Sequence, residues 1–509
     1  MTDEEVAALL RSDAALVVIE APAGCGKTYQ AAQYAAYAGR HLKQGKVLIL
    51  THTHAACSVV AKATRDCRRS VNIRTLDSLI HQVATAYHLA LSLPSDVSQW
   101  IRENSHEKLA EKVADFLDAN PSICLWIAMN YPVVICDEHQ DASIHQDRIV
   151  HCLGNSGAAL RIFGDPMQCI PGGRTQDAVE AEVRKRWDDL KTLAGANFGE
   201  LETPHRWAKT NPALGDWILQ ARDDLKNGRP VTLPDPLPRG LRIIRAENDA
   251  VRGQPYQLAP QNWTQIDGLV DAPQPAFFLA KAADIVDALR RSFRRRIAIW
   301  EGLGRDELDR LVVSATSDSA TAVTVTQALV DFVQTVISRF SNSAYANRLA
   351  AEVQNPTASP RGDIPPHLKS MALLLRNSPD CKGCSAAAAY LRDLIRNRSK
   401  GFTDLQIDYP SQLADLIRLG EFDDPAAGLL ELSQRRARAY PSPPAKSLST
   451  IHKAKGLEAH RVSLFALDGV EFTERQTRRN LLYVALSRAT SEVVLVVSDR
   501  NPTPLIVIP

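Results

Sequence analysis

The stretch Ala21-Pro-Ala-Gly-Cys-Gly-Lys-Thr28 decides the fold of this chain. It follows the apolar run Leu16–Ile19, which predicts a buried strand, and it opens a helix-compatible segment. A glycine-rich turn that happens to precede a lysine is the simpler interpretation. The strand before the stretch and the helix after it favour a loop that binds nucleotide phosphates, although Ala21 replaces the glycine with which such loops usually begin.

The chemistry expected of this loop follows from its residue types. Gly24 and Gly26 let backbone amides turn inward on phosphate oxygens. Lys27 supplies a point charge for the β- and γ-phosphates, and the Thr28 hydroxyl is a ligand for Mg²⁺. The residues that we expect to contact the nucleotide here are Ala23, Gly24, Cys25, Gly26, Lys27, Thr28 and Tyr29.

A second apolar run, Val133–Cys136, ends in two carboxylates, Asp137 and Glu138. Such a pair after a strand fits Mg–nucleotide hydrolysis, because Asp137 would hold the metal and Glu138 would accept a proton from the attacking water. An Asp-Glu pair alone is usually part of a solvated loop. The upstream phosphate loop favours the catalytic interpretation.

Apolar runs alternate with helical stretches in the first half of the chain, and the pattern returns at the C-terminal end. The runs that predict strands are Leu16–Ile19, Val47–Leu50, Val133–Cys136, Leu160–Phe163, Phe277–Ala280, Arg461–Phe465 and Val493–Val497. Runs that end in polar turns are typical of parallel sheets, which bind ligands at the carboxyl ends of their strands. We therefore expect an α/β fold with two parallel sheets. Asp306–Phe340 and Ser385–Ser399 predict helical material between them.

Seven further segments, in a fixed order along the chain, narrow the class. They are Thr51–Ala56, Thr75–Ser78, Asp137–Asp141, Phe163–Gln168, Leu201–Arg206, Leu448–Glu458 and Arg479–Ala489. In that order they resemble motifs Ia, Ib, II, III, IV, V and VI of superfamily 1 helicases. The chain is similar to the UvrD/Rep-type superfamily 1A enzymes, which implies two RecA-like domains with ATP and Mg²⁺ between them.

The resemblance implies roles for residues on the far side of the nucleotide. Arg206 and Arg488 would reach the γ-phosphate as arginine fingers, and Gln168 would sense it. Gly456 and Glu458 would contact the phosphate and the ribose. Charge that develops on the γ-phosphate must be neutralised from across the cleft, so closure of the cleft would depend on ATP.

Recognition of the base departs from the family pattern. Family members usually read adenine with a Gln about twenty residues before the loop lysine, whereas the segment Asp3–Leu10 contains none. The usual Tyr of motif IV is His205. His205 or Tyr29 could stack on the base, and the preference for ATP over other nucleotides stays open.

The resemblance also implies a track for single-stranded or tailed DNA. The residues assigned to it are Thr51, Thr53, Thr75, Ser78, Thr450 and His452. The family usually has a base-stacking aromatic after motif III, but Ile170–Arg174 has none. Stacking contributes about 1–3 kcal/mol per base, so we expect a weaker grip on the strand.

The resemblance divides the chain into four parts. Residues 1–85 with 127–195 would form RecA-like domain 1A, and residues 196–300 with 441–509 would form domain 2A. Residues 86–126 would be a small helical insertion, 1B. Residues 301–440 would be a reduced helical insertion, 2B.

Composition excludes several other classes of protein. Sixty Lys plus Arg against 58 Asp plus Glu give a formal net charge of +2, which excludes a histone-like polycation. The acidic start, Met1–Val6, predicts neither a signal nor a transit peptide, and the lack of a long apolar run predicts no membrane span. Nine cysteines in so long a chain predict no disulfide framework, and we expect free buried thiols at Cys136 and Cys152, in strand-like runs, and a reducing cytoplasm.

Two functional interpretations stay open from the sequence. The first is an ATP-driven translocase or helicase on DNA, with the 3′→5′ polarity that the resemblance implies. The second is a DNA-responsive ATPase switch that regulates a partner nuclease and unwinds little. The small size of the chain and the sequence of its phosphate loop, Ala21–Thr28, also resemble those of the helicase-like subunit of the Gabija antiphage system.

Overall fold

The chain forms two compact units, residues 1–298 with 445–509 and residues 299–444. The computed structural model describes residues 1–51, 64, 69–173, 175–247, 258–294, 296–300, 306–317, 319–357, 361–425, 427–429, 431–432 and 443–508.

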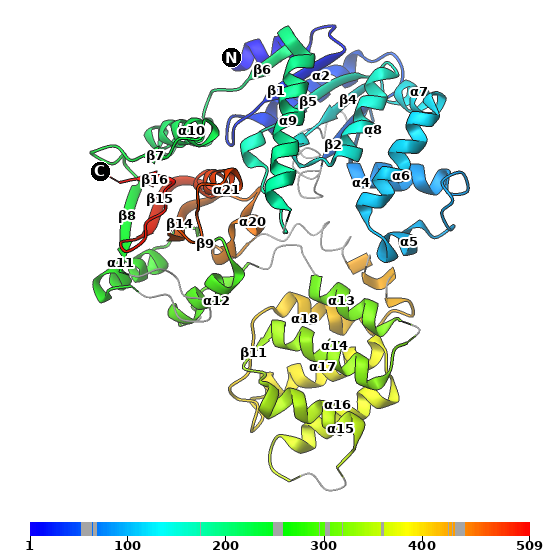
Figure 1. Ribbon diagram of the computed structural model, residues 1–509, viewed down its shortest axis with the longest axis vertical. Coiled ribbons are helices and arrows are strands. Elements are labelled where there is room, and N and C mark those ends of the chain that lie inside the picture. Colours follow the sequence, from blue (N-terminus) through cyan, green and yellow to red (C-terminus); the bar gives the residue numbers. More distant parts are fainter. Residues whose placement is uncertain are drawn as a thin grey trace. The chain divides into compact units, whose positions relative to one another are not determined.

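The first unit contains two six-stranded sheets (Figure 1). The strands of the first sheet are β1 (Leu16–Glu20), β2 (Val47–Thr51), β3 (Val71–Thr75), β4 (Val133–Cys136), β5 (Ala159–Gly164) and β6 (Phe198–Glu200). Their order is β3-β2-β4-β5-β1-β6, and all neighbours are parallel. Their carboxyl ends therefore meet at one edge, where the phosphate loop follows β1.

Helices cover both faces of the first sheet. They are α1 (Asp3–Leu10), α2 (Lys27–His41), α4 (Leu76–Ala86), α6 (His106–Ala119), α7 (Pro121–Asn130), α8 (Ile144–Asn155) and α9 (Gln176–Ala194), and the short α5 (Val97–Glu103) packs against α4. Alternate residues of each strand point to opposite faces. In β1, Val17 and Ile19 share a core with α1 and α2, whereas Val18 shares a core with helices α4, α6, α7, α8 and α9. Three short 3-10 turns also belong here: η2 (His139–Asp141), η3 (Pro166–Gln168) and η4 (Gly195–Asn197).

The second sheet has the order β10-β13-β9-β14-β15-β8. Its strands are β8 (Leu241–Ala246), β9 (Ala276–Ala280), β10 (Ala298–Ile299), β13 (Lys446–Thr450), β14 (Ala459–Leu467) and β15 (Ala489–Ser498). The pairs from β13 to β8 are parallel. All seven runs that predicted strands lie in strands of these two sheets. The two sheets confirm the predicted α/β class with two RecA-like domains.

One face of the second sheet packs against α10 (Pro212–Lys226) and α21 (Gln476–Leu486) in a shared apolar core. On the other face, the ring of Phe293 packs edge-to-face against the rings of Phe278 and Phe465, beside α11 (Pro260–Asp271) and α12 (Ala283–Ser292). The remaining elements of this unit are β7 (Val231–Thr232), α20 (Ile451–Ala454) and β16 (Ile506–Val507).

The second unit is largely helical and has its own core. Its elements are α13 (Asp306–Ala315), α14 (Ala322–Val336), β11 (Ile337–Ser338), η5 (Asn342–Ala346), α15 (Asn347–Gln354), α16 (Pro365–Asn377), α17 (Cys381–Arg396), β12 (Gln406–Ile407) and α18 (Pro410–Leu419). The predicted helical stretch Asp306–Phe340 forms two helices and a short strand. Ser385–Ser399 falls mostly in α17.

One expectation about cysteines is wrong. Cys152 lies on helix α8, not on a strand, and forms a disulfide with Cys124 on α7. The two residues are 28 apart in sequence, so their pairing depends on how α7 packs against α8 and not on local spacing. Cys136 is a free buried thiol on β4, as expected.

Within the part of the chain that the structure describes, we find no helix with the length and apolar character that a bilayer span requires.

Candidate functional site

The phosphate loop connects the carboxyl end of β1 to the N-terminus of α2. Gly24 and Gly26 have φ angles of +78° and +85°, in the left-handed region that L side chains rarely adopt. A Cβ on Gly24 would lie 2.8 Å from the Cβ of Arg206, so there is no room for a side chain. The backbone can turn here only because both positions are glycine, and the positive end of the α2 dipole opens on the loop.

Lys27 is the first residue of α2, and its side chain is buried. Its ammonium forms an ion pair with Glu138 and lies 3.4 Å from the Oδ1 atom of Asp137. Burial acts to lower the pKa of Lys27, but the carboxylates of Glu138 and then Asp137 raise it above its ordinary value. The lysine is therefore a stable cation at the bottom of the loop.

Asp137 and Glu138 follow the carboxyl end of β4, the position expected from the sequence. Burial raises the pKa of Asp137. Burial acts in the same direction on Glu138, but Lys27 and then Lys455 hold its pKa below the ordinary value, so it is ionised. Glu138 has a φ of +55°, and its Oε2 accepts a 2.6 Å hydrogen bond from Gln140 Nε2. This backbone turn and the Gln140 contact define the direction of the carboxylate.

Gln168 and Arg488 come together from the two sheets. Gln168 ends η3, just after β5, and Arg488 directly precedes β15. The Nη2 atom of Arg488 lies 3.4 Å from Gln168 Oε1 and donates to Ser487 Oγ at 2.8 Å. Arg488 is buried, and burial, followed by the neighbouring Arg206, lowers its pKa to about 10. Because two cations lie close together here in a buried place, an anion bound between them would be stabilised.

Arg206 contacts both halves of the first unit, that is, the half built on the first sheet and the half built on the second. Its backbone N–H donates to Gly24 O in the phosphate loop at 3.1 Å. Its guanidinium forms an ion pair with Glu458 and donates to Ser487 O. The structure therefore brings Arg206 to the loop, and it pairs Glu458, which we expected to contact the ribose, with that arginine.

His205 and Tyr29, the two candidates for stacking on the base, both adjoin the loop. A Cβ on Gly26 would lie 3.1 Å from His205 Cδ2, so the imidazole covers that glycine. His205 Nε2 lies 2.7 Å from Asp3 Oδ2. Tyr29 is 64% exposed, so its ring is free to meet a planar ligand.

The residues predicted for the DNA track in the first sheet lie at strand ends. Thr51 and Thr75 end β2 and β3 and are partners in the strand register. The Thr75 hydroxyl accepts from Ser78 N–H at 3.1 Å and caps α4, and Ser78 is exposed. Thr53 lies outside the described residues.

The corresponding residues of the second sheet follow β13. Thr450 ends this strand, and its hydroxyl accepts from Lys453 N–H, which caps α20. His452 is exposed on that short helix. Gly456 is exposed and has a φ of +81°, which turns the chain from α20 into β14. Two threonines therefore cap helices at the carboxyl ends of strands, one in each sheet.

Several contacts of the site were not anticipated from the sequence. Ala23 N–H donates to the hydroxyl of the buried Tyr483 at 2.8 Å, which ties the phosphate loop to α21. Lys455 Nζ lies 2.7 Å from both carboxylate oxygens of Asp141. Tyr483, Lys455 and Asp141 all lie inside the quoted motifs, but only the fold shows which of them pair.

The residues present fit a magnesium–nucleoside triphosphate. A cation, Lys27, lies where the loop meets α2, and no side chain at Gly24 or Gly26 obstructs the loop backbone. Magnesium prefers oxygen ligands and is usually held by one or two protein groups together with phosphate oxygens. Thr28 and Asp137 offer a hydroxyl and a carboxylate of this kind. The described residues contain no cluster of three or more His, Cys, Asp or Glu side chains that could hold a metal without the nucleotide.

Two family models match parts of the chain. Residues 4–174 match the AAA domain family, and residues 447–496 match the UvrD-like helicase C-terminal domain family. No curated protein matches this sequence. Neither match supports the narrower resemblance to the Gabija subunit. The first match covers β1 to β5 with the phosphate loop, and the second covers α21, Arg488 and most of β15. The chain is therefore similar to an AAA domain over the first sheet and to a UvrD-like helicase C-terminal domain over part of the second sheet.

Proposed function

We propose that the chain hydrolyses ATP between its two sheets and uses that energy to move along single-stranded DNA in the 3′→5′ direction. The observation that carries the proposal is the meeting of Gln168, beyond β5 of the first sheet, with Arg488, before β15 of the second. Two groups suited to a γ-phosphate thus face each other across the halves of the first unit. Lys27 and Glu138 supply the cation and the carboxylate that the same reaction requires.

In this proposal, some side chains of the first sheet bind the nucleotide and its metal, and another accepts a proton. Lys27 would leave Glu138 for phosphate oxygens, and Thr28 and Asp137 would hold the metal. Bound Mg²⁺ supplies charge neutralisation for the phosphates. Once Lys27 has moved, Glu138 loses its main counter-charge, so its pKa rises towards that of a useful base. An Oε atom of Glu138 then accepts the proton of the attacking water.

The second sheet contributes the arginines. Arg488 and Arg206 would donate to the oxygens of the transferred phosphoryl group, where negative charge must be stabilised. Arg206 must then release Glu458, its present partner. Lys455 and Asp141 join the same two halves at a separate ion pair. Hydrolysis would thereby change how tightly the halves are held together.

Movement along DNA needs a track that responds to this change. We assign the track to Thr51, Thr53, Thr75, Ser78, Thr450 and His452. We also propose that residues 86–126 and 301–440 act as the insertions 1B and 2B, with residues 1–85 and 127–195 as domain 1A and residues 196–300 and 441–509 as domain 2A.

Two assays test the proposal. The first compares ATP turnover by the wild-type chain with and without single-stranded DNA, and the Lys27→Ala variant is the inactive control. The second measures unwinding of duplexes that carry either a 3′ or a 5′ tail. We expect stimulation by DNA and unwinding of the 3′-tailed duplex. Turnover that no nucleic acid stimulates would refute the DNA motor, and unwinding from the 5′ tail would refute the polarity.

A second candidate function is an ATPase switch that responds to DNA and regulates a partner nuclease. The turn after motif III favours it, because Ile170–Gly173 offers no aromatic ring for stacking. DNA-stimulated turnover without unwinding by the isolated chain would support this switch over the motor.

A further inference from the structure

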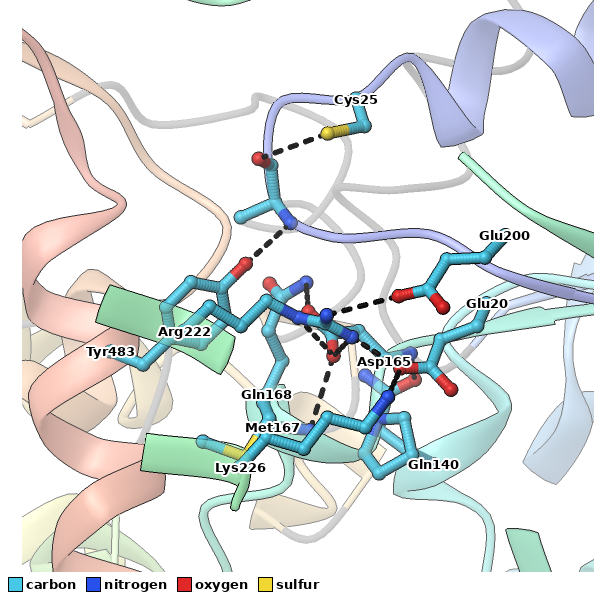
Figure 2. A network of polar contacts seen from close by, with 12 residues as sticks. Glu20, Cys25, Gln140, Asp165, Met167, Gln168, Glu200, Arg222, Lys226 and Tyr483 are labelled. Carbon is cyan, nitrogen blue, oxygen red and sulfur yellow. Dashed lines mark hydrogen bonds and ion pairs between the residues drawn. The ribbon is translucent and has the colours of Figure 1, made fainter. Parts of the chain in front are cut away.

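Arg222, on helix α10, is a buried cation that none of the steps above uses. Its side chain is 1% exposed. Figure 2 shows its guanidinium at the centre of a network of carboxylates beside the phosphate loop. Helix α10 packs against α21, which carries Tyr483 and leads into Arg488. Arg222 therefore projects from the core of the second sheet into the first.

The guanidinium contacts carboxylates at the carboxyl ends of three neighbouring strands. It forms an ion pair with Glu20, the last residue of β1. Its Nη2 lies 3.0 Å from Oδ1 of Asp165, which directly follows β5, and its Nη1 lies 3.1 Å from Oε1 of Glu200, the last residue of β6. Glu200 is the register partner of Glu20. One side chain thus links three adjacent strands at the edge where the site lies.

Each of these strands leads directly into a segment of the site. β1 continues into the loop Ala21–Thr28, β5 into the turn that ends at Gln168, and β6 into the segment that ends at Arg206. The shared guanidinium therefore joins the strands that lead into the three segments, in addition to the backbone hydrogen bonds of the sheet.

Asp165 connects this network to the groups that face the γ-phosphate. Its Oδ2 accepts from Gln168 Nε2 at 3.1 Å, and its Oδ1 accepts from Met167 N–H at 3.1 Å. Gln168 then presents its Oε1 to Arg488 Nη2 at 3.4 Å. A carboxylate is only an acceptor, so Asp165 determines which end of the Gln168 amide faces Arg488.

We propose that Arg222 is a positioning residue for ATP hydrolysis, which acts through Asp165 to orient the Gln168 amide towards Arg488 and the γ-phosphate. The inference rests on the proposed ATPase function and adds a residue outside the segments that resemble helicase motifs. Arg222 does not touch the nucleotide in this role. Its effect is transmitted through two hydrogen-bonded side chains.

A purely structural role would have different consequences. Glu20 and Asp165 are buried, and removing the cation would leave them uncompensated, which is strongly destabilising whatever the site does. Lys226 also pairs with Glu20, but no contact of Lys226 with Asp165 is present. Loss of stability alone therefore cannot identify positioning. The decisive measurement is whether the effect of an Arg222 substitution on ATP turnover depends on Gln168.

The main variant is Arg222→Lys, which keeps the charge but lacks the planar fork that reaches several carboxylates at once. We expect kcat for DNA-stimulated ATP hydrolysis to fall by about 10²-fold, the size associated with misplacement of a reacting group by about 1 Å. The KM for ATP should stay within about 3-fold of wild type, because the phosphate loop itself is unchanged.

Arg161→Lys is the matched control. Arg161 is a buried arginine on β5 of the same sheet, and its guanidinium donates to the backbone carbonyls of Leu10, Ser12, Ala14 and Leu160. None of these contacts leads to Gln168. We expect Arg161→Lys to lower the melting temperature and to leave kcat near wild type.

A double-mutant cycle with Gln168→Ala tests the route. If Arg222 acts through Gln168, Arg222→Lys should change kcat by less than about 3-fold in the Gln168→Ala background, measured by single turnover. Asp165→Asn probes the same link at constant side-chain size. The amide NH₂ of the asparagine would face Gln168 Nε2, so the hydrogen bond between these two side chains would be lost. This substitution should lower kcat without weakening ATP binding, and it provides the test if Arg222→Lys does not fold.

The outcomes separate this inference from the proposed function. A wild-type chain without ATP turnover would overturn the proposed function and this inference together. A wild-type chain that hydrolyses ATP, combined with an Arg222→Lys or Asp165→Asn variant of normal kcat, would overturn only the inference. An equal loss of kcat from Arg222→Lys with and without Gln168 would also overturn it, because the effect would then follow another route.

Discussion

Glu138, the carboxylate that we propose as the catalytic base, is the residue whose contacts most directly predict the effect of a substitution. It is ionised, paired with Lys27, and held at a φ of +55° with a hydrogen bond from Gln140. Glu138→Gln keeps the side-chain size but removes the group that can accept the proton of water. We expect at least about 10²-fold loss of ATP turnover with ATP affinity retained. Calorimetric titration with Mg–ATP beside a turnover assay checks this, and an equal loss of both would contradict the assignment of Glu138 as the base.

Arg488 provides the second prediction at this scale. It is buried and in contact with Gln168, beside the proposed position of the γ-phosphate. Arg488→Ala should lower turnover by about 10³-fold, the lower end of what an arginine finger contributes, and change the dissociation constant for ATP little. Lys453→Ala, the loss of an exposed cation on α20, is the control. If Arg488→Ala abolished DNA binding and spared turnover, the residue would belong to the DNA track instead.

The disulfide between α7 and α8 makes a prediction at the scale of elements. It closes a loop of 28 residues, for which chain entropy alone corresponds to about 3–4 kcal/mol of stabilisation. Reduction, or the double change Cys124→Ala and Cys152→Ala, should lower the free energy of unfolding by about that amount at most. Urea unfolding with and without reductant measures it. Non-reducing peptide mapping should recover the Cys124 and Cys152 peptides as one linked species, and separate peptides from oxidised protein would contradict the pairing.

The turn after η3 is the place where the proposed grip on single-stranded DNA can be tested. Gly172 and Gly173 have open space around the position of a Cβ, but Gly173 has a φ of +85°, which would strain any side chain there. Gly172 has no such restriction. We expect Gly172→Trp to strengthen binding of single-stranded DNA by about 1–3 kcal/mol through base stacking. Gly172→Ala is the control. Binding by the wild-type chain should depend steeply on salt, with about −0.7 in slope per phosphate contacted. A shallow slope, or no gain from Trp, would contradict the weak-grip interpretation.

At the scale of the whole molecule, the helical unit is an insertion between neighbouring strands. The chain leaves the second sheet at β10 and returns at β13, and these two strands are adjacent. The termini of the inserted residues therefore lie close together, and the insertion has its own core. We expect residues 299–444 to fold alone, with a helical circular-dichroism spectrum and cooperative melting.

The remaining unit should also keep its nucleotide site. All of the proposed nucleotide-binding and catalytic residues lie in residues 1–298 and 445–509. Replacing residues 301–443 by a short flexible linker should leave the affinity for Mg–ATP within about 3-fold of the full chain, whatever happens to unwinding. Calorimetric titration measures this. Loss of nucleotide binding in a variant that still melts cooperatively would show that the site depends on the helical unit.

The sequence by itself determined the class of fold, and its motifs predicted the chemistry of the site. Seven apolar runs predicted strands that are present, since long buried strands need nothing but their own side chains to be recognised. The other strands of the two sheets, β3, β6, β8, β10 and β13, were missed. The sequences of β3 and β13, VNIRT and KSLST, are as polar as loops. The positions of the loop and of Asp137 and Glu138 could be predicted, because each follows directly from a buried strand, β1 or β4, of the same parallel sheet.

Only the tertiary structure decided the long-range pairs. Arg206 with Glu458, Lys455 with Asp141 and Arg488 with Gln168 join residues more than two hundred positions apart. No local pattern predicts such partners, because they depend on how two sheets pack. The same is true of Arg222, which lies in an ordinary amphipathic helix outside the resembling segments. Its partners become visible only when α10 brings one guanidinium to the ends of three strands, where burial makes the pairing of those charges obligatory.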